Sequence, residues 1–163
     1  GNPSGIDVNQ VLSDTPLLFS KEHGAKKLPF SLDSYLLIID TGVVGITKHT
    51  LEHVKDNLKT YKPYIDELGS ITKKVIKPLK EKNIDLIGEY MYKAHSLLQK
   101  IGVSHEKNDE VVELCKNNNA KGAKLTGGGA GGCCICLCDT KENALKIQDE
   151  LKEKGYLSWM VTV

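Results

Sequence analysis

Five glycines crowd into the six residues Gly127–Gly132, interrupted only by Ala130. A stretch with so few Cβ atoms can turn sharply and aim several backbone N–H groups at one point, an arrangement that binds anions and phosphate above all. We call residues Gly127–Gly132 the glycine loop. A flexible linker is the alternative interpretation, but apolar segments of strand length flank the loop on both sides and favour a held turn. The loop is not a Walker loop, because no Gly-Lys-Ser/Thr sequence follows the glycines.

Asp7 is the next candidate for chemistry. It follows Pro3-Ser4-Gly5-Ile6, in which Ser4 can cap a short helix, and a carboxylate in the first helical turn is favoured by the helix dipole. From the residues alone, this structural role is favoured over catalysis. His95 lies on the apolar face of a predicted helix and His105 lies in a turn, and for both we also expect a structural role.

The cysteines do not form a disulfide pattern. Four of the five lie in the segment Cys133–Cys138, and a strand would place Cys134, Cys136 and Cys138 on one face. Neighbours on that face would be roughly 6.5–7 Å apart, too far for a comfortable disulfide or for a shared tetrahedral metal. We therefore expect reduced, buried, metal-free side chains in a reducing cytoplasm.

The composition excludes several classes of partner. Among 163 residues, 22 Lys and Arg balance 21 Asp and Glu, and a net charge of +1 argues against broad binding to nucleic acid or to a membrane surface. There is no apolar run of membrane-spanning length and no signal peptide, so we expect a cytoplasmic protein. The sequence opens without an initiator methionine, which predicts that it is part of a longer chain.

The elements that must hold these residues follow from the hydrophobic pattern. Strands are predicted at Tyr35–Asp40, Gly122–Thr126, Cys133–Cys138 and Tyr156–Val163, and short ones at Pro16–Ser20 and Leu28–Phe30 around a turn at Lys21–Lys27. Helices are predicted at Thr47–Tyr61, from Pro63 to about Leu79, and at Asn83–Ile101, Glu106–Asn118 and Lys141–Lys154. This order predicts an α+β fold, with a four-stranded, mainly antiparallel sheet and helices packed on one face. Residues 1–31 do not join the pattern and form a separate region from residues 32–163.

Four segments together resemble the GHMP kinases, the superfamily of galactokinase, homoserine kinase, mevalonate kinase and phosphomevalonate kinase. Lys124 to Gly132 is similar to the C-terminal glycine motif of that superfamily, and Pro3 to Asp7 is similar to the segment that carries the catalytic aspartate in its mevalonate kinase branch. Asp40-Thr41-Gly42 through Thr47-Lys48, and Ile101 to His105, also resemble that branch. The resemblance covers the whole chain but only the C-terminal half of such an enzyme. It implies that residues 1–31 are a remnant of the N-terminal kinase domain.

The resemblance implies transfer of the γ-phosphoryl group of ATP, with Mg²⁺, to the primary hydroxyl of mevalonate. Asp7 would be the catalytic base, and no residue of this chain is assigned to the metal. The cofactor-binding residues would be Gly127, Gly128, Gly129 and Ala130, and the substrate-binding residues would be Thr41, Thr126 and Gly128. The expected partners are mevalonate, ATP and the N-terminal half of the same enzyme, with a homodimer left open.

The chain also departs from the family pattern. The upstream lysine segment and the Gly-Leu-Gly-Ser-Ser phosphate loop are absent, so we expect this chain alone to be inactive. The family has alanine at the position of Gly128 and glycine at that of Ala130, and a positive φ at Ala130 would cost roughly 1 kcal/mol. Two other interpretations stay open: another GHMP-type kinase or decarboxylase, and a non-catalytic GHMP-like interaction domain.

Overall fold

A computed structural model describes residues 10–45 and 47–163. The chain divides into two compact units, one ending at Ser31 and the other spanning Leu32–Val163. That the first unit is a remnant of an N-terminal kinase domain stays a prediction. None of the described helices is long and apolar enough to cross a membrane.

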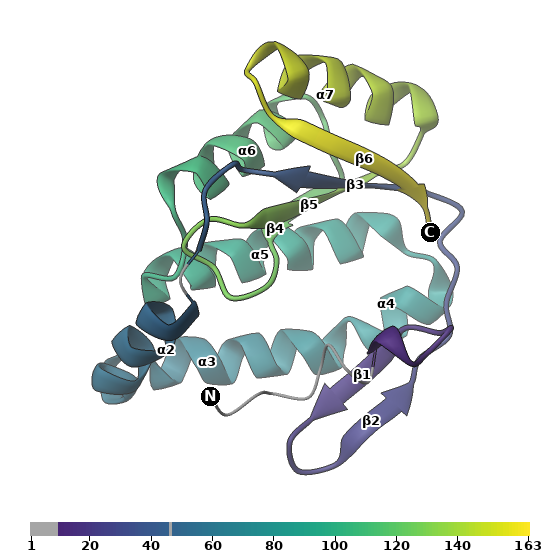
Figure 1. The fold of residues 1–163 in the computed structure, drawn as a ribbon. Coiled ribbons are helices and arrows are strands. Elements are labelled where there is room, and N and C mark those ends of the chain that lie inside the picture. Colours follow the sequence, from purple (N-terminus) through teal and green to yellow (C-terminus); the bar gives the residue numbers. More distant parts are fainter. Residues whose placement is uncertain (1–9, 46) are drawn as a thin grey trace. The chain divides into compact units, whose positions relative to one another are not determined.

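The larger unit is built on a four-stranded sheet (Figure 1). Its order is β4-β5-β3-β6, and every neighbouring pair is antiparallel, as predicted. The strands are β3 (Tyr35–Asp40), β4 (Gly122–Leu125), β5 (Cys133–Cys138) and β6 (Leu157–Thr162). Asp40 pairs with Cys133, so the carboxyl end of β3 lies beside the residue that follows the glycine loop.

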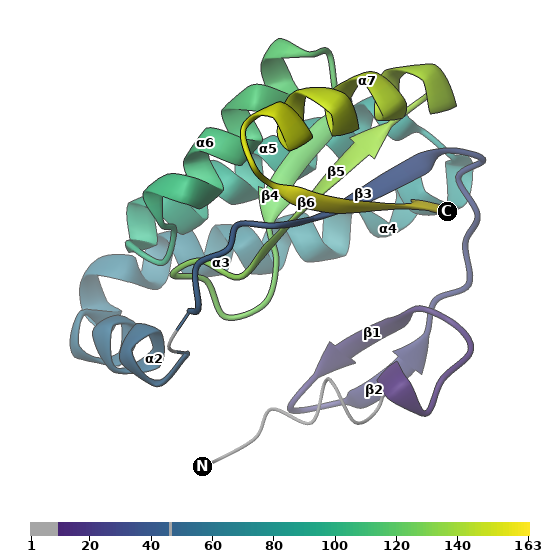
Figure 2. The ribbon, with the colours of Figure 1, turned by 45° about the horizontal axis from the view of Figure 1, so that its top comes forward.

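Helices α5, α6 and α7 pack on one face of the sheet, as the sequence predicted, and the other helices of this unit join them through helix–helix contacts (Figure 2). They are α2 (Thr47–Asp56), α3 (Leu58–Lys74), α4 (Ile76–Glu81), α5 (Ile84–Ile101), α6 (Glu106–Asn117) and α7 (Lys141–Glu153). α5 packs on β4, α6 on β4 and β5, and α7 on β3, β5 and β6, whereas α3 packs against α5. The core between sheet and helices is apolar, and its fully buried side chains include Leu37, Ile39, Leu125, Val111, Ile147 and Leu151.

The ends of α5, α6 and α7 are fixed by local chemistry. The Asn83 side chain accepts a hydrogen bond from Leu86 N at 3.1 Å at the start of α5, and Gly102, at φ +76°, ends it. The His105 ring accepts from Lys107 N at 3.1 Å at the start of α6, and the Thr140 hydroxyl accepts from Asn143 N at 3.1 Å at the start of α7. These caps explain why the predicted bounds of the three helices agree closely with the structure.

The predicted helices before α5 were wrong in their boundaries. The predicted helix Thr47–Tyr61 is interrupted at Asn57, and Pro63 lies inside α3 instead of opening a helix. Pro63 is exposed on α3, so the carbonyl that lacks its N–H partner can face water. The predicted helix from Pro63 to Leu79 is likewise divided at Val75 into α3 and α4.

The smaller unit contains one described hairpin, of β1 (Leu17–Ser20) and β2 (Gly24–Lys27). The predicted second strand, Leu28–Phe30, was therefore wrong. Gly24, at φ +67°, allows the chain to turn back within a few residues, so the return strand begins inside the predicted turn.

Candidate functional site

The glycine loop joins β4 to β5, and most of its backbone is left-handed. φ is positive at Gly127, Gly129, Gly131 and Gly132, and also at Ala130, where it is +57°. Thr126 N donates to Cys133 O at 2.9 Å and closes the base of the loop. The turn therefore depends on the run of glycines, and Ala130 adopts a conformation that costs an L-residue about 1–2 kcal/mol.

The second half of the loop is held by three backbone N–H donors. Ala130 N donates to Val103 O at 2.8 Å, and Gly132 N donates to Val43 O at 2.8 Å. Gly131 N donates to the Asn108 side chain at 3.0 Å. The segment after β3 and the turn after α5 therefore both hold residues 130–132.

Close packing adds a second requirement for glycine in the loop. A Cβ at Gly129 would lie 2.2 Å from Val103 O, and one at Gly131 would lie 2.7 Å from Val43 O. At Gly127 nothing lies within 4 Å of the Cβ position, so glycine is needed there only for the backbone angle.

The first half of the loop leaves its N–H groups available. Within the described chain, the N–H groups of Gly127, Gly128 and Gly129 donate to no protein acceptor. Gly127 and Gly128 are also exposed. Consecutive backbone N–H groups in a glycine turn form an anion-binding nest, and here the adjoining half holds that nest in place.

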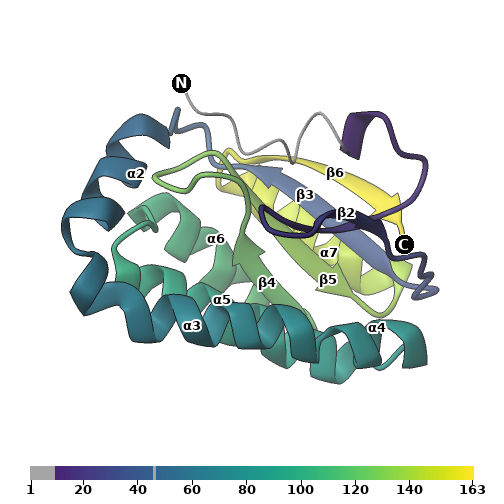
Figure 3. The same ribbon diagram turned by 90° about the horizontal axis from the view of Figure 1, so that it is seen from below.

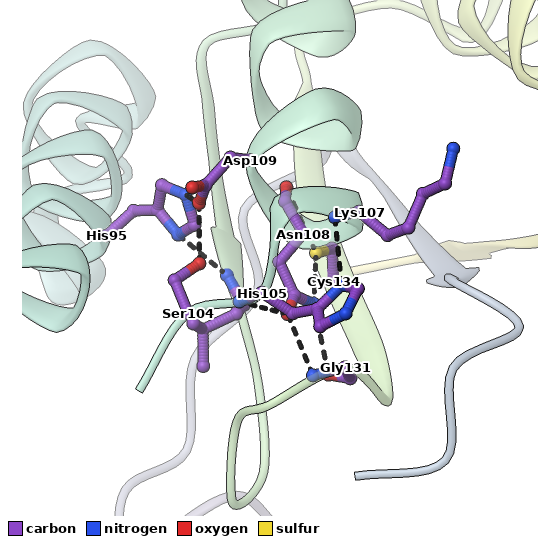
Figure 4. A network of polar contacts seen from close by, with 9 residues as sticks. His95, Ser104, His105, Lys107, Asn108, Asp109, Gly131 and Cys134 are labelled. Carbon is purple, nitrogen blue, oxygen red and sulfur yellow. Dashed lines mark hydrogen bonds and ion pairs between the residues drawn. The ribbon is translucent and has the colours of Figure 1, made fainter. Parts of the chain in front are cut away.

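Asn108 connects the loop to α6, and sequence reasoning missed it (Figure 4). Its side chain is fully buried, and its Oδ1 accepts from Gly131 N at 3.0 Å and from His105 N at 3.1 Å. Its Nδ2 donates to Gly131 O at 3.0 Å and contacts Cys134 Sγ at 3.4 Å. One sequence signal was available: Asn108 stands three residues after the helix-capping His105, the spacing of a capping box.

His95 lies in α5 and is buried (Figure 4). Its Nδ1 accepts from Leu125 N at 3.3 Å, so its Nε2 carries the proton and donates to Asp109 Oδ1 at 3.1 Å. The Ser104 hydroxyl donates to the same carboxylate oxygen at 2.5 Å. Burial lowers the pKa of His95, and Asp109 opposes that effect. Both ring nitrogens have partners, which fits a structural role.

His105 is the N-cap of α6. Its Nδ1 accepts from Lys107 N at 3.1 Å, and its own N–H donates to Asn108. Like His95, it uses its ring to position backbone next to the glycine loop.

The two predicted substrate-binding threonines both lie at the base of the loop. Thr41 is buried, and its hydroxyl donates to Gly132 O at 2.6 Å while its N–H donates to the same oxygen at 3.0 Å. Thr126 is partly buried and follows β4. Contact of either residue with a substrate stays a prediction.

Asp7 and its capping Ser4 lie outside the described residues, so the structure does not place the predicted catalytic base. Within residues 10–45 and 47–163, no group of three His, Cys, Asp or Glu side chains could hold a metal ion. Ligands for Mg²⁺ are therefore not grouped in this part of the chain.

The cysteines of β5 are unpaired thiols, and Cys134, Cys136 and Cys138 are fully buried, as expected. Burial raises the pKa of Cys134 to about 11. The sulfur atoms of Cys136 and Cys138 are 3.9 Å apart, closer than strand geometry alone suggested but far beyond a disulfide bond. These side chains act as small apolar residues in the core between sheet and helices.

Comparison with known proteins gives matches along this chain. The family described as GHMP kinases C terminal matches residues 75–157. A mevalonate kinase from Pyrococcus abyssi is 32% identical over 151 residues, which cover 87% of this chain and 44% of the relative. A mevalonate kinase from Saccharolobus solfataricus is 33% identical over 91 residues, which cover 56% of this chain and 29% of the relative. The chain spans less than half the length of these curated relatives.

Solved structures of mevalonate kinases also superpose on this chain. The L. major mevalonate kinase in complex with R-mevalonate superposes with a TM-score of 0.89 at 25% identity, over 99% of this chain and 53% of that one. The mevalonate kinase of methicillin-resistant Staphylococcus aureus superposes with a TM-score of 0.76 at 27% identity, over 99% of this chain and 52% of that one.

Proposed function

The chain belongs to the GHMP kinase family, and we propose that it is the C-terminal part of an enzyme that transfers the γ-phosphoryl group of ATP to the primary hydroxyl of mevalonate. The observation that carries this proposal is the glycine loop, whose first three N–H groups donate to no described acceptor while the next three are held by the protein. The similarity to mevalonate kinases supports the choice of substrate, since the L. major relative was solved with R-mevalonate.

The loop suits the phosphates of ATP. When bound, ATP would supply the phosphoryl group, and catalysis of its transfer rests on positioning and on neutralising negative charge. The N–H groups of Gly127, Gly128 and Gly129 would donate to phosphate oxygens. Gly127 and Gly128 are exposed, which allows a ligand to reach the loop, and the fixed residues 130–132 remove the entropy that a free loop would lose on binding. The Ala130 N–H already donates to Val103 O, so Ala130 would shape the loop rather than contact phosphate.

Two roles fall outside the glycine loop. Asp7 would accept the proton of the mevalonate hydroxyl or orient that hydroxyl. The described residues offer no metal-binding group, so we derive no step through Mg²⁺ and expect its ligands to come from the N-terminal half of the enzyme.

A coupled kinase assay tests the proposal. The purified chain should show no turnover with ATP and mevalonate, because the cleft of such an enzyme lies between two domains and this chain supplies one wall. Adding the N-terminal half in trans should produce turnover with mevalonate but not with phosphomevalonate. In that mixture, Asp7→Asn should lower kcat by roughly 10²–10⁴.

Two results would overturn the assignment. Turnover by the chain alone would show that it holds a complete active site. Preference of the mixture for phosphomevalonate would move the substrate to another member of the superfamily.

A further inference from the structure

A cavity of about 380 Å³ lies within the larger unit, between α3, α5 and β4. Figure 3 shows α3 and α5 running side by side beside β4. The wall of the cavity is mostly apolar, and its apolar side chains include Leu68, Ile71, Ile87, Met91, Leu98 and Leu125. Its volume is near the lower end of the range for small-molecule sites, about 300–1,000 Å³.

Lys124 brings a positive charge to this apolar wall. Its side chain is partly buried, and its Nζ donates to the carbonyl oxygen of the next residue, Leu125, at 2.5 Å. No carboxylate of a described residue forms an ion pair with this ammonium, and burial lowers its pKa. By contrast, Lys121, three residues earlier, pairs with Asp85 at 2.7 Å and with Asp139 at 3.4 Å.

An ammonium taken partly out of water without a counter-ion is destabilising, and a bound anion would supply the missing charge. The apolar wall behind it favours a ligand with an apolar body. Because the site offers a single ammonium, it suits a single negative charge better than a dianionic phosphate ester.

From this combination we propose that the cavity binds an amphipathic carboxylate of modest size, with its carboxylate at Lys124 and its apolar chain between α3 and α5. A medium-chain fatty acid is the simplest member of that class. The cavity borders the glycine loop at Gly127, but no phosphate and no transfer step enters the argument for it.

Calorimetric titration of the 163-residue chain with decanoate, below its micelle concentration, tests the proposal. Decanoate should bind with one-to-one saturation and at least about tenfold more tightly than decanol, which has the same chain but no charge. Lys124→Met should remove that difference by weakening decanoate binding about tenfold while leaving decanol unchanged. The matched variant Lys121→Met, which also removes one lysine charge, should bind decanoate as the original chain does.

A second variant tests the cavity without touching the charge. Thr72 lines the cavity but is exposed on α3, so Thr72→Trp should fill the mouth without disturbing the core, as circular dichroism can verify. Both decanoate and decanol should lose at least about tenfold in affinity. Equal affinity for the two ligands, no saturable binding, or unchanged decanoate binding by folded Lys124→Met or by Thr72→Trp would each overturn the proposal. The Thr72→Trp result decides the matter even if Lys124→Met fails to fold.

Discussion

The two halves of the glycine loop share one residue type but differ in what their backbone N–H groups do. Residues 130–132 donate to Val103, Asn108 and Val43, and a Cβ at Gly131 would collide with Val43. Residues 127–129 donate to no described acceptor, and two of the three are exposed. One half of a glycine run can thus fix the backbone, while the other half keeps N–H groups that no described acceptor uses.

Substitutions in the two halves should therefore differ in effect, one half changing stability first and the other changing ligand binding first. Changes to the fixed half should act on folding first, because they leave buried polar groups without partners. Changes to the other half should act on the ligand first, because no contact within the described protein depends on its N–H groups.

The largest effect is expected for Gly128→Val in the two-domain kinase. A β-branched side chain resists the backbone of a nest and intrudes on the space for phosphate oxygens, so kcat/KM for ATP should fall by roughly 10². Thermal unfolding should change little. Gly69→Val is the matched control, because Gly69 is exposed on α3 with nothing within 4 Å of its Cβ position. Normal ATP kinetics in Gly128→Val would remove the phosphate role from this half of the loop.

Asn108→Ala should have the opposite profile. It leaves the N–H and C=O of Gly131 and the N–H of His105 without their buried partner, which should lower the free energy of unfolding by about 3 kcal/mol. Urea denaturation measures this loss. Asn117→Ala, at an exposed position of the same helix, should cost far less. If the two variants are equally stable, Asn108 does not hold the loop.

Some elements of the fold were predictable from the sequence and others were not. The sheet and the helices α5 to α7 were predictable because their apolar residues recur at clear helical and strand spacings and their ends carry caps. The break at Asn57 was not, because Leu51 and Leu58 have the spacing of one helix face but are 64% and 52% exposed and form no buried stripe.

The glycine loop was predictable as a turn, but the separate roles of its two halves were not. Val43, Val103 and Asn108 lie far from the loop in sequence, and only the tertiary fold brings their polar atoms to it. The expected cost at Ala130 depended on its φ, and the structure gives that angle as positive.

Ala130→Gly should stabilise the folded chain, by less than Asn108→Ala destabilises it. Glycine adopts φ +57° without the steric cost that alanine bears, so the free energy of unfolding should rise by about 1 kcal/mol. Asn119→Gly is the control, because Asn119 also has positive φ but asparagine tolerates it, and its gain should be smaller. A loss of stability in Ala130→Gly, measured by chemical denaturation, would show that the angle carries no strain.

The smallest effect concerns pH and His95, which accepts the N–H of Leu125 two residues before the loop. Burial lowers the pKa of His95 in the folded chain, so the unfolded chain binds the proton more readily. Stability should therefore fall as the pH drops from the ordinary histidine pKa, about 6.5, through the lowered folded value. His95→Asn, which keeps an acceptor for Leu125, should show a weaker decline in urea midpoint over that window. An identical decline in both proteins would assign the pH dependence to other groups.

An NMR titration of the chain with millimolar ATP, following the backbone amide of each loop glycine, tests most directly whether the two halves of the glycine loop differ in ligand binding. We expect chemical-shift changes at the amides of Gly127, Gly128 and Gly129. The amides of Gly131 and Gly132 should stay nearly unchanged, because their N–H groups stay bonded to Asn108 and Val43. Adenosine, which has no phosphate, should leave all five unchanged. Shifts of equal size in both halves, or no ATP-dependent shift at residues 127–129, would contradict the account.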